Sequence, residues 1–117
     1  MLELRTPTRA AFMRLLRSQV LVAREHDGRV VDATRLQPAA ALDALHARDA
    51  RNVPLGAAPG PSSTRFAVWA PTARAAAVCV YDGPSGPART FQRLRHDART
   101  GAWTANVAGD LSGRYYR

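Results

Sequence analysis

The stretch Thr64-Arg65-Phe66-Ala67-Val68-Trp69-Ala70-Pro71-Thr72-Ala73 decides the fold of this 117-residue chain. Within it, Phe66 and Val68 fall on one face of an extended segment and Trp69 falls on the other. Alternation with a period of two is typical of a strand that buries one face. We therefore predict a strand over residues 64–70.

Further short segments follow this one and are separated by turn signals. Asp82–Pro87, Asp97–Gly101 and Gly109–Gly113 are rich in residues that favour turns, and Gly101 can adopt a left-handed conformation. The segments between them that alternate or look extended are 75–81, 90–95, 103–107 and 114–117. Several short strands at this spacing predict a mostly β protein with a β-sandwich fold.

The first half of the chain predicts a different architecture. Thr6-Pro7 is a helix start, because a threonine side chain can cap free N–H groups and proline tolerates the first helical position. The helix that follows carries its apolar and its arginine residues on opposite sides: Phe12, Leu15 and Leu16 against Arg9, Arg14 and Arg17. We expect these arginines to be solvated.

A β-hairpin and a second helix are predicted next. Val20–Glu25 and the run from Val30 flank the turn residues His26-Asp27-Gly28, where Gly28 should take a positive φ. Pro38 begins the second helix, whose apolar side holds Leu42 and Leu45, and Asn52 and Pro54 end it. The domain organisation we predict is a helix–hairpin–helix lead-in at 1–53, a linker at 54–63 and a sandwich at 64–117.

Composition narrows the class of protein. All seventeen basic residues are arginine, and the formal net charge is +8. Arginine without lysine fits either nucleic-acid recognition or GC-rich coding. The arginines occur in every predicted element beside acidic residues, which favours GC-rich coding and argues against a nucleic-acid partner. We find no apolar run long enough to span a membrane and no secretory signal pattern in 1–19, and the compartment stays open.

Catalytic and metal chemistry are not indicated. His26, His46 and His96 lack metal-ligand spacing, and the single cysteine, Cys79, fits a buried apolar role. Asp97 and Asp110 lie in turns, where aspartate commonly bonds its own backbone. We therefore expect no catalytic residue, no metal and no cofactor.

The aromatic residues remain as binding candidates. Flat aromatic faces bind sugar rings and also stack on bases, although burial in a core is their more common role. The candidates for carbohydrate contact are Trp69, Tyr81, Trp103 and Tyr115, with Tyr116 beside them.

Four motifs of the second half together resemble carbohydrate-binding module family 48. Residues 64–73 resemble its Phe-x-Val-Trp-Ala-Pro-Thr-Ala signature, and Val80-Tyr81-Asp82 resembles its second strand. Residues 97–103 resemble its Asp-x-x-Thr-Gly-x-Trp hairpin, and residues 109–116 resemble Gly-Asp-Leu-x-Gly-x-Tyr-Tyr. The resemblance implies an immunoglobulin-like β-sandwich of the early-set type, incomplete at residue 117.

The first half is similar to the region upstream of this module in pullulanase-type α-1,6-glucosidases of glycoside hydrolase family 13. The similarity rests on 20–23, 27–30 and Leu42-Asp43-Ala44-Leu45-His46-Ala47, where His46 replaces a tyrosine of the family. In sugar-binding relatives a tryptophan follows the second strand, whereas here the loop is Gly83-Pro84-Ser85-Gly86.

The resemblance implies a non-catalytic N-terminal module of a starch- or glycogen-debranching enzyme. Its expected partners are a downstream catalytic barrel and α-glucan, such as pullulan, amylopectin or glycogen. Because 114–117 has the pattern of a strand that is cut short, we expect a longer parent protein. We expect this chain to be inactive alone. The alternatives are an autonomous α-glucan-binding module and an arginine-rich nucleic-acid-binding domain.

Overall fold

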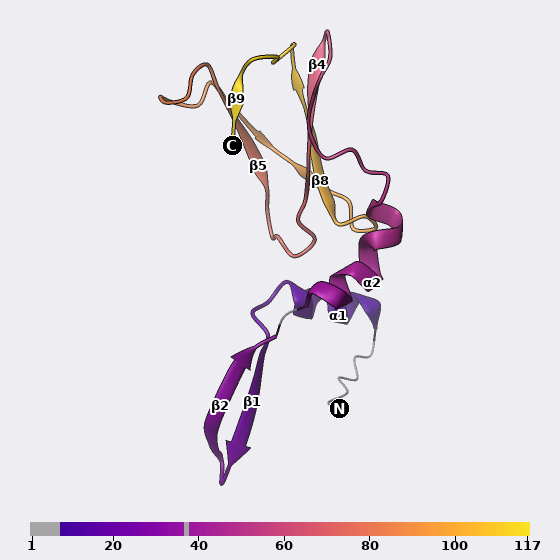
Figure 1. The fold of residues 1–117 in the computed structure, drawn as a ribbon, viewed down its shortest axis with the longest axis vertical. Helices are drawn as coiled ribbons and strands as arrows, with labels where there is room; N and C mark the ends of the chain where they lie inside the picture. Colours follow the sequence, from indigo (N-terminus) through magenta and orange to yellow (C-terminus); the bar gives the residue numbers. More distant parts are fainter. Residues whose placement is uncertain (1–7, 37) are drawn as a thin grey trace.

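The computed structural model of the protein describes residues 8–36 and 38–117. Two helices and a hairpin form one end, and a β-sandwich forms the other (Figure 1). The radius of gyration is 19.0 Å, whereas a compact chain of this length has about 13 Å. The molecule is elongated, at 62 × 32 × 17 Å, because the hairpin projects away from the rest (Figure 1).

Helix α1, Arg9–Leu16, is capped by Thr8, whose Oγ1 accepts a hydrogen bond from the backbone N–H of Ala11 at 3.1 Å. The helix start predicted at Thr6-Pro7 lies outside the described residues. Arg14 is exposed as expected, but the prediction of a fully solvated arginine face is wrong for Arg17. Its guanidinium lies against a histidine of the sandwich and is only partly exposed.

The predicted hairpin is confirmed. Strands β1, Leu21–His26, and β2, Arg29–Arg35, pair antiparallel around the two-residue turn Asp27-Gly28. Both turn residues have positive φ, 49° and 71°, as a type I′ turn requires. A bulge at Arg24/Glu25 shifts the register once.

Helix α2, Ala39–Ala50, follows Pro38 as predicted. Leu42 and Leu45 are only half-buried, and the fully buried residue of this helix is His46, at 1% exposure. The helix therefore docks on the sandwich through a polar side chain. Neither helix is long and apolar enough to cross a membrane, among the residues that the structure describes.

The predicted β-sandwich is confirmed as two facing antiparallel sheets. The larger has the order β3-β4-β8-β7, and the smaller has the order β6-β5-β9. Their bounds are Gly56–Pro59 for β3, Ser63–Trp69 for β4, Ala77–Tyr81 for β5, Thr90–Arg93 for β6, Arg95–His96 for β7, Ala102–Ala108 for β8 and Tyr115–Tyr116 for β9.

The core lies between the two sheets, where the alternation of the strands predicted it. Phe66 from β4 meets Val78 and Val80 from β5. The remaining buried members are Leu94, Trp103 and Val107. Val68 shares the inward face of β4 with Phe66, yet it is exposed, and it lines an opening between the sheets together with Val78 and Leu94.

The linker predicted at 54–63 is wrong, since it contains an edge strand. Residues Gly56–Pro59 form β3, which pairs with β4 from Gly56 opposite Ala67 to Pro59 opposite Thr64. An edge strand tolerates proline, because its outward N–H needs no partner in the sheet. The proline content that suggested a linker is therefore compatible with a strand at this edge.

The strand predicted over 90–95 divides at Leu94. Residues Thr90–Arg93 pair with β5 in the smaller sheet, whereas Arg95–His96 pair with β8 in the larger one. Leu94 is buried in the core between them, and its N–H bonds the carbonyl of Ala76 at 2.9 Å. This crossing closes the sandwich along one side.

Candidate functional site

The outer face of the β6-β5-β9 sheet brings two predicted aromatic residues together. Tyr81 lies directly opposite Tyr115 across the β5–β9 pair, and Val80 lies opposite Tyr116. Because successive residues point to opposite faces and Val80 is in the core, Tyr81 and Tyr115 face outward. Tyr115 is 51% exposed.

Phe91 is a third aromatic residue of this face, which the sequence analysis did not single out. It lies opposite Cys79, an outward residue two positions before Tyr81, and it is 62% exposed. The guanidinium of Arg117 lies 5.5 Å from the centre of the Tyr81 ring. We call Phe91, Tyr81, Tyr115 and Arg117 the aromatic face. Phe91 reaches this face because its strand, β6, pairs with β5. The sequence alone does not show that pairing.

Asp82 ties the loop after β5 to the approach of β9. Its Oδ1 accepts hydrogen bonds from Nη1 of Arg89, at 3.0 Å, and from Nη1 of Arg114. The hydrogen bond from Arg89, together with the charges of both arginines, holds the pKa of the Asp82 carboxyl below its ordinary value. These groups are well exposed, so their pairing adds little stability. It joins Asp82, which follows Tyr81, to Arg114, which precedes Tyr115.

Trp69 and Trp103 lie elsewhere and do not join the aromatic face. The indole Nε1 of Trp69 donates to the carbonyl of Thr100 at 2.9 Å, and that of Trp103 donates to the carbonyl of Ala70 at 2.9 Å. Trp103 is 7% exposed. Trp69 thus joins the end of β4 to the turn before β8, and Trp103 joins β8 to the residue after β4.

The turn at 97–101 joins the sandwich to the helices. Asp97 accepts hydrogen bonds from the Arg99 N–H and the Thr100 hydroxyl, both at 2.9 Å, and these bonds lower the pKa of its carboxyl. The neighbouring His96 ring packs on Trp103, with 4.8 Å between ring centres. Burial, and next the charge of Arg17, lower the pKa of His96. The predicted left-handed Gly101, with a φ of 72°, is confirmed.

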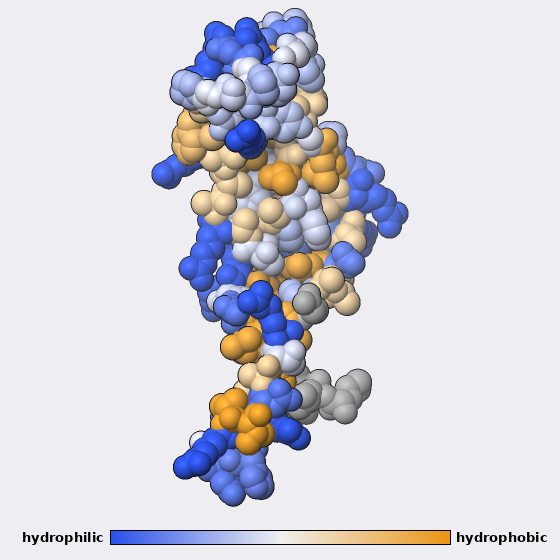
Figure 2. All heavy atoms as spheres, turned by 60° about the vertical axis from the view of Figure 1, so that its left-hand side comes forward, coloured by the Kyte–Doolittle hydropathy of each residue, from blue (hydrophilic) through white to orange (hydrophobic). Residues whose placement is uncertain are grey.

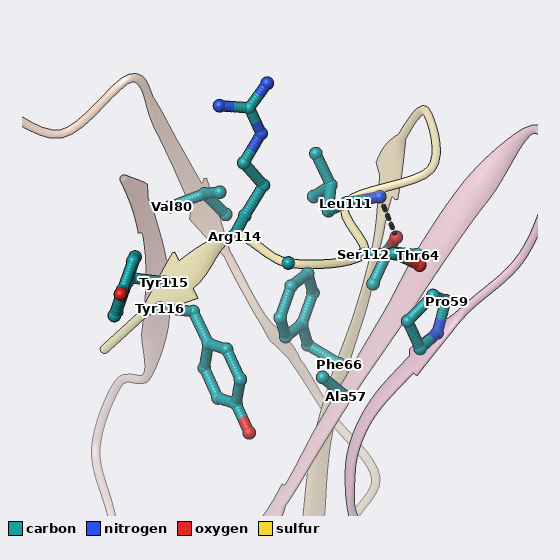
Figure 3. A pocket seen from close by; sticks show the side chains of 11 residues that line it. Ala57, Pro59, Thr64, Phe66, Val80, Leu111, Ser112, Arg114, Tyr115 and Tyr116 are labelled. Carbon is teal, nitrogen blue, oxygen red and sulfur yellow. Dashed lines mark hydrogen bonds between the residues drawn. The ribbon is translucent and has the colours of Figure 1, made fainter. Parts of the chain in front are cut away.

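An opening of about 160 Å³ lies between the two sheets at the end where β9 pairs with β5 (Figure 3). Phe66 and Tyr116 face each other across it, with ring centres 5.2 Å apart. Thr64 and Leu111 also line it, and the Thr64 hydroxyl accepts a hydrogen bond from the Leu111 N–H at 3.0 Å. The lining is mostly apolar and holds no acidic group, so the opening carries no acid–base chemistry.

The remaining polar residues form no reactive cluster. Among residues 8–36 and 38–117, no three His, Cys, Asp or Glu side chains are placed to hold a metal ion. Cys79 is half-buried on the outer face, and Asp110 accepts hydrogen bonds from Ser112 within its own turn. The aromatic face is therefore the candidate site for non-covalent contacts.

The arginines serve different local contacts. Arg65 donates to the carbonyl of Pro54, Arg9 donates to that of Leu45, and Arg99 pairs with Asp49 at 3.6 Å. These contacts lie on several elements and hold neighbouring segments together.

Two family profiles match the chain in series. Residues 54–117 match the carbohydrate-binding module 48, the isoamylase N-terminal domain, and residues 1–44 match the pullulanase N2 domain. The chain therefore belongs to the carbohydrate-binding module 48 family. Because the N2 domain precedes that module, the protein is the N2 and module 48 region of the pullulanase type.

Known relatives agree with this assignment. A pullulanase of Klebsiella pneumoniae is 35% identical over 98 residues, 84% of this chain and 9% of the relative. Pullulanase 1, chloroplastic, of Arabidopsis thaliana is 33% identical over 103 residues, 87% of this chain and 10% of the relative. The chain thus spans about a tenth of the curated relatives it matches.

Solved structures show the same arrangement of elements. A Klebsiella pneumoniae pullulanase complexed with maltotriose superposes with a TM-score of 0.79 at 31% identity, over 95% of this chain and 11% of that one. PulA from Klebsiella oxytoca gives 0.79 at 32% identity, over 95% of this chain and 10% of that one.

Proposed function

We propose that this chain serves as the non-catalytic module of a pullulanase-type starch- and glycogen-debranching enzyme. In this role it packs against the catalytic region and helps to position α-glucan, while the α-1,6 bond is hydrolysed elsewhere in the full-length enzyme. The observation that carries the proposal is the match of one chain to two consecutive domains of that enzyme type.

We propose that glucan contacts the aromatic face. Tyr81 and Tyr115, both predicted candidates, present ring surfaces there beside Phe91. Sugar rings pack their C–H edges on such surfaces, and the guanidinium of Arg117 can donate hydrogen bonds to hydroxyl groups. The other two candidates, Trp69 and Trp103, are less suited, because their indoles already bind backbone carbonyls.

A second candidate function is autonomous α-glucan binding, without any catalytic partner. The exposure of Phe91 and Tyr115 on one face favours it. The loop at 83–86 has no aromatic residue to extend that face, so we expect weak binding.

Native gel electrophoresis through amylopectin tests the glucan contact. We expect the mobility of the chain to fall as amylopectin is added, and the retardation to decrease in Tyr115→Ala. Tyr115→Phe is the matched control, because it keeps the ring, and it should be retarded like the parent chain. Unchanged mobility of the parent chain at all amylopectin concentrations would overturn the glucan contact.

A further inference from the structure

The β1–β2 hairpin is amphipathic. On β1, Leu21, Ala23 and Glu25 share one face, and the register places Arg35, Ala33 and Val30 of β2 opposite them on that same face. Four of these six side chains are apolar, and the charged Glu25 and Arg35 border them. We call Leu21, Ala23, Val30 and Ala33 the apolar hairpin face. The opposite face carries Val22, Arg24, His26, Arg29, Asp32 and Thr34.

The apolar hairpin face is uncovered within the described residues. Every residue of both strands is exposed, including Leu21 at 55% and Val30 at 59%. The hairpin lies apart from the sandwich (Figure 1). Figure 2 shows apolar side chains at the surface of the narrow lower part of the molecule, where the hairpin lies.

An isolated two-stranded hairpin is at best marginally stable in water and needs a third element against one face. Here the register is well defined by a two-residue turn and a bulge, so the same side chains always share a face. A face on which four apolar side chains are bordered by two charged ones, and whose reverse side is mostly polar, is typical of a surface that another part of a protein covers. The helices and the sandwich do not supply that cover.

We propose that the apolar hairpin face docks on the catalytic region of a pullulanase-type enzyme. The solved pullulanase of Klebsiella oxytoca matches 95% of this chain, and the match covers only 10% of the length of that pullulanase. In that relative the segment that matches this chain is therefore a small part of a much longer chain. The mixed charges of its other face, with Arg24 opposite Asp32, do not favour a polyanion. This inference rests on the proposed function and names the surface that performs the packing.

The test mixes this chain with Klebsiella pneumoniae pullulanase lacking the matched segment and measures the dissociation constant by calorimetry. We expect binding, weakened at least about tenfold by Val30→Asp, because a buried unpaired carboxylate is costly. Val22→Asp is the matched control, since it changes the same residue type on the opposite face of the same hairpin. It should bind within about twofold of the parent chain.

The outcomes separate the two proposals. Equal binding by Val30→Asp and the parent chain would overturn the docking surface and leave the module function intact. No binding by the parent chain would overturn both the docking surface and the packing role. A third outcome is that this chain forms a dimer that Val30→Asp abolishes and does not bind the trimmed enzyme. It would show that a second copy covers the face, and it would also overturn the inference.

A second measurement does not require the trimmed enzyme to fold alone. In a fusion with this chain in place of the matched segment, amide exchange in the hairpin should slow at least about tenfold relative to the isolated chain. Equal exchange in the fusion and in the isolated chain would overturn the docking surface.

Discussion

The imidazole Nδ1 of His46 lies 3.1 Å from the carbonyl oxygen of Arg99, 53 residues further along the chain. Because a carbonyl oxygen can only accept a hydrogen bond, Nδ1 carries the hydrogen and donates the bond. This bond joins α2 to the turn that precedes β8. The ring is almost fully buried, so this contact links the two ends of the molecule in a place that water does not reach.

We expect His46→Leu to destabilise the chain by about 1–3 kcal/mol, because it leaves the Arg99 carbonyl without its donor. The change should appear as a lower midpoint in urea unfolding. His26→Leu, in the exposed hairpin turn, is the control and should change the midpoint little. An unchanged midpoint for His46→Leu would contradict the role of this bond.

A second prediction concerns Gly101. A Cβ at this position would lie 2.7 Å from Cβ of Pro71, and the φ of 72° is itself unfavourable for an L-residue. We expect Gly101→Ala to cost more than about 2 kcal/mol in the free energy of unfolding. Gly28→Ala has nearly the same φ and no atom within 4 Å of the added carbon, so it isolates the cost of φ alone. Equal losses in the two variants would contradict a steric role for Pro71.

The sandwich could be predicted from the sequence because its strands carry strong local patterns. Val78 and Val80 alternate with Cys79 and Tyr81, and the structure buries the valines. The crossing at Leu94 could not be predicted, since the pattern of 90–95 is continuous. Its division depends on pairing with β5 on one side and β8 on the other, which are long-range contacts.

The candidate site was only partly predictable for a related reason. Trp103 and Tyr115 both lie in short extended segments, but alternation does not say which face of a strand turns inward. That depends on the opposing sheet, which covers Trp103 and leaves Tyr115 exposed. The burial of His46 was missed because its partner, Arg99, is remote in sequence.

A third prediction concerns Thr64, which is buried and bridges two segments. Its hydroxyl donates to the carbonyl of Gly109 at 3.1 Å and accepts from the N–H of Leu111 at 3.0 Å. We expect Thr64→Val, which keeps the shape, to destabilise by about 1–3 kcal/mol. Thr104→Val, on a half-buried position of β8, is the control. Similar midpoints for both variants in thermal unfolding would show that the bridge is unimportant.

A fourth prediction is that the chain alone releases no reducing ends from pullulan. Glycoside hydrolysis needs two carboxyl groups held about 5–10 Å apart across the bond to be cut. Asp82 accepts a hydrogen bond from an arginine, and Asp97 and Asp110 accept hydrogen bonds from residues of their own turns. A reducing-sugar assay should match the blank, with Klebsiella pneumoniae pullulanase as the positive control. Release that persists through repurification and disappears in Asp97→Asn would contradict the prediction.

The last prediction is a loss of stability on acidification in two stages. The pKa of His96 is lowered by burial and by Arg17, and further by His46, with Asp97 opposing. The unfolded chain therefore binds a proton more readily than the folded one, so this contribution is complete above about pH 6.5 and is lost as pH falls through the folded pKa. The pKa values of Asp82, Asp97 and Asp110 are also lowered. Their contribution is present above about pH 4 and is lost below it.

Thermal unfolding measured between pH 8 and pH 3 checks this order. We expect the midpoint to begin to fall below about pH 6.5 and to fall again below about pH 4. His96→Gln should remove the first decline and keep the second, because it retains a polar side chain without a titrating ring. His26→Gln is the control in the exposed turn. If His96→Gln and the parent chain decline in parallel between pH 7 and pH 5, the first stage does not arise from His96.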